Sequence, residues 1–216
     1  MLEKMDVFFE NRLAGYDEHM LTTIEGAREF YKFTAMQLPM GADSKVLDLG
    51  CGTGLELEEY FSLNPSVHIT GIDLSAAMLH ALSKKFPNRN LHLIHGSYFE
   101  VPFGNNKYTA AVSVESLHHF TEKQKRMLYQ KLVQALAADG YFVLTDYFAE
   151  TRELENEYFD NLKRLKQELN IVDDAFYHYD TPLTVEHEME ILGSVGFSNV
   201  EILKNWDATY MLKAMR

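Results

Sequence analysis

A short apolar run followed by three alternating glycines is the feature that most constrains the fold of this chain. Residues 46–49 predict a buried strand that carries one acid, Asp48, and Gly50, Gly52 and Gly54 follow it before a helical spacing of apolar residues begins. Because glycine has no Cβ, the backbone can turn sharply there and a ligand can come close. The free N–H groups of the next helix would face that ligand. The pattern therefore predicts a nucleotide-type ligand at the first strand-to-helix turn.

The glycine spacing narrows the kind of ligand. A dinucleotide fingerprint G-x-G-x-x-G would need a third glycine at Leu55 or Leu57. Instead, residues 46–54 (VLDLGCGTG) closely resemble the first motif of class I S-adenosylmethionine (SAM) dependent methyltransferases. A carboxylate near this loop suits a ligand with a cationic sulfonium and an α-ammonium group, whereas it would repel a pyrophosphate. The resemblance covers residues 43–149 and implies methyl transfer from SAM to an acceptor.

The resemblance also implies cofactor contacts at the ends of the first four strands. The glycine loop and Asp48 would hold the methionine moiety, residues 97–99 would cover the adenine, and residues 115–116 would pass beneath the cofactor. The cofactor-binding residues that we predict are Asp48, Gly50, Cys51, Gly52, Gly54, Asp73, Leu74, Met78, Ser97, Tyr98, Phe99, Glu115 and Ser116.

Asp73 is predicted to bind the ribose because of its position in the sequence. It follows Gly54 by 19 residues and stands at the end of a strand predicted over residues 67–72. In doubly wound folds, an acid at about this distance accepts hydrogen bonds from the ribose hydroxyls. Ser75 is expected to cap the next helix, and Asp73 could instead only assist that cap. Its position favours ribose binding.

At the third strand the chain departs from the family. Where the family commonly has Gly-Asp-Ala, this chain has Gly96, Ser97 and Tyr98. A serine hydroxyl accepts a hydrogen bond from the adenine amino group more weakly than the carboxylate it replaces. Tyr98 and Phe99 are expected to form a ring wall beside the adenine, or else to be plain core residues.

Two residues are predicted to be catalytic. The fourth strand ends in the run 115–120 (ESLHHF), which resembles the mouth of the site in many small-molecule methyltransferases. His118 could take a proton near neutral pH, although it and His119 could instead orient the loop through backbone hydrogen bonds. Tyr16 stands in a region that covers the cofactor in the family, and it could equally be a core tyrosine between two helices.

The fold class that we predict is α/β: a Rossmann-like, doubly wound, seven-stranded, mainly parallel sheet with a reversed terminal hairpin and a helical cap. Strands alternate with helices in the expected order. Two details concern helix ends: one long helix is expected from Met20 to Leu38, and another is expected to end at Asp139 and Gly140. The predicted domains are an N-terminal cap (1–42), a SAM-binding core (43–149), a helical insertion of the cap (150–183), and the last helix with the hairpin (184–216).

Composition limits the partners. The net charge is −12, with 32 acidic against 20 basic residues, which disfavours a nucleic-acid substrate. Cys51 is the single cysteine, so no internal disulfide can form and a reducing compartment is expected. No signal peptide and no apolar run of roughly 18 residues is visible, so we expect a cytoplasmic protein without a membrane span.

Several alternatives stay open. Residues 186–188 (EHE) do not match H-E-x-x-H, and we expect no resident metal, although a magnesium site at Asp146, Asp173 and Asp174 is conceivable.

The acceptor is expected to be a small molecule of unknown identity, and the oligomeric state is undetermined. The chain could instead be a SAM-binding activator of another enzyme. It could also modify SAM itself, with Arg12 or Arg28 binding a second carboxylate.

Overall fold

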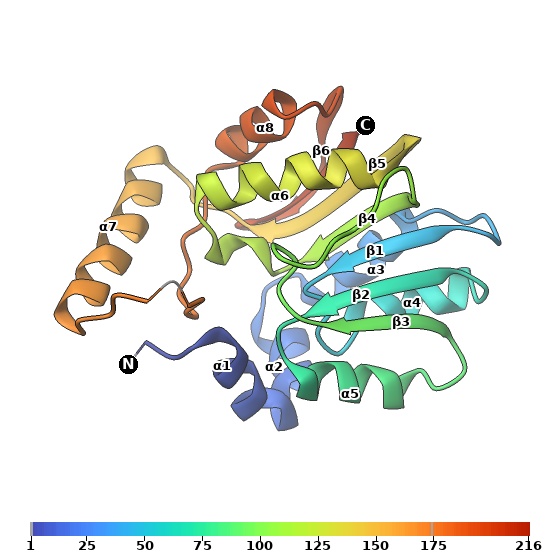
Figure 1. Ribbon diagram of the computed structural model, residues 1–216, viewed down its shortest axis with the longest axis horizontal. Helices are drawn as coiled ribbons and strands as arrows, with labels where there is room; N and C mark the ends of the chain where they lie inside the picture. The colour runs from blue at the N-terminus through green and yellow to red at the C-terminus, as the bar shows by residue number, and fades with distance from the viewer. Residues whose placement is uncertain (1, 174) are drawn as a thin grey trace.

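The computed structural model describes residues 2–173 and 175–216 (Figure 1). Asp174, considered above as a magnesium ligand, lies outside these residues. The helices and strands run in the order α1 (Met5–Arg12), a 3-10 turn (Leu13–Gly15), α2 (Tyr16–Thr23), α3 (Ala27–Gln37), β1 (Lys45–Leu49), α4 (Leu55–Leu63), β2 (His68–Asp73), α5 (Ala76–Lys85), β3 (Asn90–His95), β4 (Tyr108–Val114), a second 3-10 turn (Leu117–His119), α6 (Glu122–Ala135), β5 (Leu136–Tyr147), α7 (Arg152–Glu168), α8 (Val185–Ser194), β6 (Asn199–Trp206) and β7 (Thr209–Met215).

The described strands form one seven-stranded sheet in the order β3-β2-β1-β4-β5-β7-β6. Strands β1 to β5 are parallel, and β7 enters in reverse between β5 and β6. The predicted fold class is therefore confirmed, including the antiparallel terminal hairpin. The strand order reverses at β1, which places the carboxyl ends of β1 and β4 beside the crevice where ligands bind in open α/β sheets.

Helices cover both faces of the sheet, and successive strand residues alternate between two cores because side chains alternate along a strand. On β1, Leu47 and Leu49 join a core with α6 and α8. Val46, from the same strand, joins a second core with α3, α4 and α5. Both faces of β1 are thus buried, as expected for a central parallel strand.

Two predicted helix ends were wrong. The helix expected from Met20 to Leu38 is two helices, because Gly26 adopts φ +73° and a Cβ there would lie 2.6 Å from the Cβ of Trp206. The helix expected to reach Gly140 ends at Ala135. Leu136 is already extended and pairs with Tyr108, and the residues up to Gly140 form an irregularity in the sheet.

Helices α1, α2 and α7 lie at the end of the molecule where the parallel strands finish, whereas α3 lies behind the sheet (Figure 1). The N-terminal segment is joined to the segment before α8: Met5 donates to the Phe176 carbonyl at 2.9 Å, and His178 donates to the Glu3 carbonyl at 3.0 Å. These bonds position the cap over the strand ends. The domain boundaries given above stay predictions.

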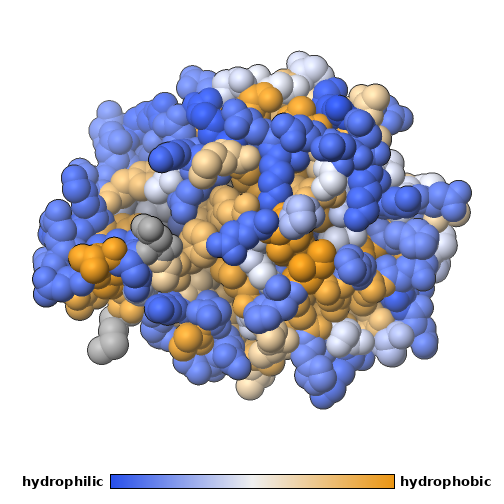
Figure 2. Space-filling view, in the orientation of Figure 1, coloured by the Kyte–Doolittle hydropathy of each residue, from blue (hydrophilic) through white to orange (hydrophobic). Residues whose placement is uncertain are grey.

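The surface in this view shows apolar side chains across its middle, bordered by hydrophilic side chains (Figure 2). Of the helices in residues 2–173 and 175–216, none has the length and apolar content needed to cross a membrane.

Candidate functional site

The glycine loop has the backbone geometry that only glycine adopts readily. Gly50, Gly52 and Gly54 have φ values of +74°, +46° and +73°, in the left-handed region. A Cβ at Gly50 would fall 2.1 Å from Ser116 Oγ, so the loop packs tightly against the end of β4. A Cβ at Gly52 would meet only the ring of Tyr16, at 3.9 Å. The space above Gly52 is therefore a cradle in which a ligand can contact the backbone.

Asp73 joins the end of β2 to this loop. One carboxylate oxygen accepts from the Gly52 N–H at 2.9 Å, and the other accepts from the Ser75 N–H at 2.8 Å. Burial raises the pKa of Asp73, and these two N–H groups partly oppose that rise. The helix cap itself is the Ser75 hydroxyl, which accepts from the Met78 N–H at 3.3 Å. Since a carboxylate has about four lone-pair sites, Asp73 retains capacity for ribose hydroxyls.

Asp48 lies beneath the loop beside a second buried acid, Glu56 of α4, which the sequence analysis did not identify. The two residues are 1% and 5% exposed. Burial raises the pKa of Asp48 well above its ordinary value, and Glu56 adds to that rise. Burial also raises the pKa of Glu56, to about 7. Among the described side chains, Asp48 Oδ2 and Glu56 Oε1 are the buried polar atoms that have no hydrogen-bond partner. Orphaned acceptors of this kind fit a cationic ligand group nearby.

A narrow cleft of about 40 Å³ lies above the loop. Tyr16, Phe9 and Met5 of the N-terminal segment cover it. The predicted cofactor residues that line this cleft are Gly50, Gly52, Asp73, Leu74, Met78, Tyr98, Glu115 and Ser116. Apart from Met78, which lies in α5, these residues lie at or just after the ends of β1, β2, β3 and β4, as the parallel topology requires.

Four other predicted cofactor residues lie within the packed interior: Asp48, Cys51, Gly54 and Ser97. Cys51 is buried, and its sulfur lies beside Gly71. Gly54 packs against Phe86 and Leu82 at the start of α4. The hydroxyl of Ser97 accepts from the Phe99 N–H at 3.2 Å. The contacts of these residues with a cofactor stay predictions.

Phe99 is half-buried and belongs to an aromatic cluster that packs against the core. Its ring is 4.8 Å from that of Phe120 and 5.5 Å from that of Phe176. Tyr98 is different, because its hydroxyl lies 3.2 Å from Ser116 Oγ and its side chain reaches the cleft. Of the two rings predicted beside the adenine, the structure therefore places Tyr98 at the cleft.

A second cavity, of about 760 Å³, adjoins the first. Phe9, Tyr16, Glu115 and His119 line both cavities. The larger cavity falls in the usual range of small-molecule sites, about 300–1,000 Å³. The geometry is thus a narrow cleft along the strand ends with a roomy chamber beside it.

His118 is at the floor of the larger cavity, where Asp146 at the end of β5 orients it. Its Nδ1 lies 2.5 Å from Asp146 Oδ1, and the other oxygen of Asp146 accepts from the Leu117 N–H at 2.8 Å. Burial alone would lower the pKa of His118, but Asp146 and Glu115 outweigh that effect and raise it to about 9. Because Nδ1 faces Asp146, Nε2 is the nitrogen left for other partners.

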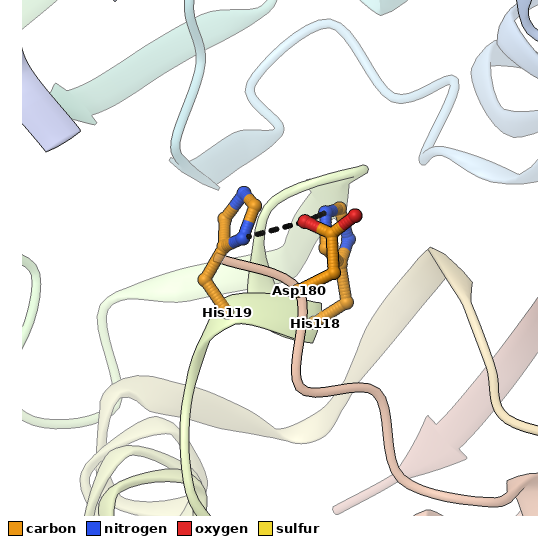
Figure 3. A group of neighbouring side chains, drawn as sticks. All are labelled: His118, His119 and Asp180. Atoms are coloured by element: carbon orange, nitrogen blue, oxygen red, sulfur yellow. Dashed lines mark ion pairs between the residues drawn. The ribbon is translucent and has the colours of Figure 1, made fainter. Parts of the chain in front are cut away.

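Asp180, from the segment before α8, faces both histidines (Figure 3). Its Oδ1 lies 3.2 Å from His119 Nδ1 and 3.7 Å from His118 Nε2. These rings and the carboxylate all line the larger cavity. Sequence reasoning considered Asp146 only as a conceivable magnesium ligand and did not single out Asp180. The signal for Asp146 was its place near the end of a strand adjacent to β4. The signal for Asp180 was weaker: it lies in a loop dense in aromatic and polar side chains, and such loops commonly line substrate pockets.

Glu115 separates the two cavities. Its backbone has φ +49°, which is rare for a residue with a side chain, and such outliers cluster at functional sites. One carboxylate oxygen accepts from the Thr209 hydroxyl at 3.1 Å. Burial raises the pKa of Glu115 to about 7. The carboxyl group of Glu115, which lines both cavities, therefore changes its charge close to neutral pH.

Tyr16 closes the cleft from the cap side. Burial, together with the nearby acids Asp73 and Glu56, raises the pKa of Tyr16, so its hydroxyl stays protonated. The next residue, Asp17, accepts from the Thr53 hydroxyl at 2.5 Å and pairs with Lys85 at 3.2 Å. Helix α2 is therefore fastened to the glycine loop and to α5.

Comparisons with known proteins agree with this geometry. Residues 46–140 match the family model described as a methyltransferase domain. The chain is 25% identical over 132 residues to a demethylmenaquinone methyltransferase of Chlamydia pneumoniae, which is 61% of this chain and 56% of that protein. It is 31% identical over 117 residues to a tRNA (carboxymethyluridine(34)-5-O)-methyltransferase of Arabidopsis thaliana, which is 54% of this chain and 26% of that protein. The solved structure of a DhpI–SAH complex superposes with a TM-score of 0.71 at 14% identity, over 97% of this chain and 93% of that one.

The sheet order with its reversed hairpin, and the glycine loop at the strand ends, agree with the fold that the resemblance to class I SAM-dependent methyltransferases predicts. The match to a methyltransferase domain covers residues 46–140, which is less than half of the chain. The chain spans 56% and 26% of the length of the two relatives compared above, and their names specify different acceptors.

Proposed function

We propose that this chain transfers the methyl group of SAM to a small-molecule acceptor held in the larger cavity. The observation that carries this proposal is the juxtaposition of the two cavities. A cleft at the glycine loop and a chamber of about 760 Å³ share the wall formed by Tyr16, Glu115 and His119. A cofactor in the first would place its reactive group at the boundary of the second.

The chain's own residues would hold the cofactor from three sides. The N–H groups of the glycine loop and the carboxyls of Asp48 and Glu56 suit the methionine end. Asp73 suits the ribose hydroxyls, because its carboxylate is fixed by the Gly52 and Ser75 N–H groups. Tyr98 offers a ring beside the adenine. Each of these assignments is part of the proposal.

The reaction that we propose is a single in-line displacement. A lone pair of the acceptor forms a bond to the methyl carbon, the carbon–sulfur bond breaks, and its electron pair returns to sulfur to give S-adenosylhomocysteine. Since the methyl group is already activated by the positive sulfur, positioning provides much of the rate. When the acceptor carries a proton, the neutral form of His118 takes it, and this form is the minor one near neutral pH because the pKa of His118 is raised to about 9. Asp146 fixes the orientation of that ring. Tyr16, whose hydroxyl stays protonated, donates a hydrogen bond at the boundary of the chambers.

The lining of the larger cavity favours a small and partly aromatic acceptor. The rings of Phe8, Phe9, Tyr147 and His178 line it together with a few charged groups. Aromatic walls with a small number of placed polar groups are typical of small-molecule sites. The excess of acidic residues over basic ones, 32 against 20, adds repulsion against a phosphate backbone.

Calorimetry with SAM and S-adenosylhomocysteine tests the cofactor assignment. We expect both to bind the wild-type chain at sub-millimolar concentrations, and Asp73→Asn to weaken both by roughly tenfold or more, from the loss of a charge-assisted hydrogen bond. Asp139→Asn, at an exposed position in the irregular part of β5, is the matched control and should bind normally. Circular dichroism would show that both variants are folded. Equal binding by all three chains would contradict the assignment.

One observation favours a second candidate, an enzyme that modifies SAM itself. Arg12 lines the larger cavity, where it could meet a second carboxylate. Its guanidinium is also held by Glu3 at 3.2 Å and lies 3.6 Å from the Phe8 ring centroid, so it is already partnered. Mass analysis of the nucleoside that co-purifies separates the candidates. Unmodified SAM or S-adenosylhomocysteine supports methyl transfer, whereas a heavier, carboxylated sulfonium nucleoside supports the second candidate.

A SAM-binding activator without turnover is separated by a different readout. Formation of S-adenosylhomocysteine, measured with a panel of small phenols, amines and thiols, supports an enzyme. Tight SAM binding without formation of this product in any extract would favour the activator.

A further inference from the structure

We propose that His118, His119 and Asp180 form a binding site for a divalent transition-metal ion at the floor of the larger cavity (Figure 3). The proposed ligand atoms are His118 Nε2, His119 Nδ1 and an Asp180 oxygen. Two imidazoles and one carboxylate form a donor set that suits zinc and ferrous iron, with coordination positions left open. This proposal replaces the expectation that the chain has no resident metal.

The spacing of the donors fits one ion. Metal–nitrogen and metal–oxygen bonds of about 2.0–2.2 Å in a tetrahedral site place neighbouring ligand atoms roughly 3.4 Å apart. Asp180 Oδ1 lies 3.2 Å from His119 Nδ1 and 3.7 Å from His118 Nε2. The three ligand atoms all lie within 4.8 Å of one another. Small movements of Asp180, whose side chain is 46% exposed, would bring them to equal distances.

The groups behind the ligands match those of known metal sites. Metal-binding histidines usually donate their other N–H to a carboxylate, which fixes the ring and its tautomer. His118 has this partner in Asp146, at 2.5 Å from Nδ1, so its Nε2 points away from that carboxylate. The carboxylates of Asp146, Asp180 and Glu115 surround the site with negative charge, which favours a bound cation.

His119 must change its tautomer when the ion binds. Its Nδ1 lies 3.3 Å from the Tyr179 carbonyl as well as 3.2 Å from Asp180, and both neighbours accept hydrogen bonds. In the metal-free protein the Nδ1 proton is therefore shared with oxygen acceptors. Metal binding transfers this proton to Nε2 and frees the Nδ1 lone pair.

The cavity supplies the open side of the site. His118, His119 and Asp180 all line the larger cavity, and so do Tyr147 and Glu115. An acceptor oxygen in this chamber could occupy an open coordination position, which would lower its pKa and aim it toward the first cavity. This role rests on the proposed function, whereas the metal site itself does not. With the ion bound, the ion polarises the acceptor, because His118 Nε2 is then engaged.

Cobalt titration tests the site. The full chain, without a histidine tag and freed of metal by a chelator, is titrated with Co²⁺ while the visible ligand-field absorption is recorded. We expect a single Co²⁺ bound per chain and displaced by Zn²⁺. His119→Ala and Asp180→Asn should each weaken binding by about 100-fold or more, and Asp146→Asn by about 10- to 100-fold.

The matched control is His178→Phe. The His178 ring lies 4.8 Å from that of His119 and stacks on Phe8 at 3.4 Å, so phenylalanine preserves the packing while it removes a nearby nitrogen. We expect this variant to bind Co²⁺ as the wild type does. Absence of ligand-field absorption in the wild type, or equal Co²⁺ affinity in the ligand variants, would overturn the proposal. A drop in affinity only in His178→Phe would overturn the assigned ligands.

Calorimetry with S-adenosylhomocysteine on the same samples keeps the two proposals separate. Loss of metal binding with normal nucleoside binding concerns the metal site alone. Failure of nucleoside binding in the wild type concerns the proposed function alone.

Discussion

Replacing Glu56 by glutamine should remove a pH-dependent loss of stability that originates beneath the glycine loop. Glu56 is 5% exposed and lies beside the buried Asp48, and neither Glu56 Oε1 nor Asp48 Oδ2 has a hydrogen-bond partner among the described residues. Burial raises the pKa of Glu56 from 4.5 to about 7. Glutamine has nearly the same shape and no charge, so the substitution isolates the cost of ionising this group.

The magnitude follows from the raised pKa. Between pH 4.5 and about 7 the folded state binds a proton at Glu56 that the unfolded state has released, so stability falls as the pH rises through this range. At about 1.4 kcal/mol for each pKa unit, the loss approaches about 3 kcal/mol above pH 7. Below pH 4.5 Glu56 is protonated in both the folded and the unfolded state, so this loss of stability is absent. Glu56→Gln should therefore match the wild type in acid and exceed its stability by about 3 kcal/mol at pH 8.

Urea unfolding between about pH 5 and about pH 8 measures this difference. Trp206, the single tryptophan and 9% exposed, provides the fluorescence signal. Glu59→Gln, on the same helix at a half-buried position, is the control and should follow the wild-type pH profile. A stability difference between Glu56→Gln and the wild type that stays constant over this range would refute the reasoning, as would a less stable variant at pH 8.

Three further outcomes are expected. Gly50→Ala should weaken nucleoside binding by at least about tenfold and lower the melting temperature. The left-handed backbone costs a residue with a side chain roughly 1–2 kcal/mol, and the new Cβ would fall 2.1 Å from Ser116 Oγ. Nucleoside binding equal to that of the wild type in calorimetry would contradict this. Lys125→Met should destabilise the fold by about 3–5 kcal/mol in urea unfolding, since it leaves the fully buried Glu188 without its ion-pair partner. Asp17→Ala should speed dissociation of S-adenosylhomocysteine about fivefold in stopped-flow measurements, as expected for one lost hydrogen bond of about 1 kcal/mol; an unchanged rate would show that this contact does not limit release.

The sheet could be predicted from the sequence because its determinants are local. Each parallel strand is a short apolar run, and each is followed by turn chemistry that only a few residues provide. Thr121 and Gln124 form the capping box expected for α6. The two helix ends that were wrong depend on contacts distant in sequence. Gly26 is held in its left-handed conformation against Trp206, which lies 180 residues further along the chain.

The site was predictable only where strand ends supply it. Gly52 and Asp73 follow directly from strand-to-helix turns, and the structure brings them within 2.9 Å of each other. Asp48 faces the helix side of its strand, and its partner Glu56 comes from the first turn of α4, which no strand-end argument identifies. Asp180 reaches His119 through an irregular segment with neither helical nor strand periodicity. Such contacts depend on tertiary packing.

The fastening of α2 has a consequence for the pace of the catalytic cycle. Asp17 ties this helix to Thr53 in the glycine loop and to Lys85 in α5, and the neighbouring Tyr16 lines the cleft of about 40 Å³. A space of about 40 Å³ is too small for a nucleoside, so the proposed cofactor would enter and leave after these ties break and the N-terminal helices move aside. The strength of two polar contacts at the rim, rather than the chemistry at the methyl group, would then set how often the enzyme begins a new round.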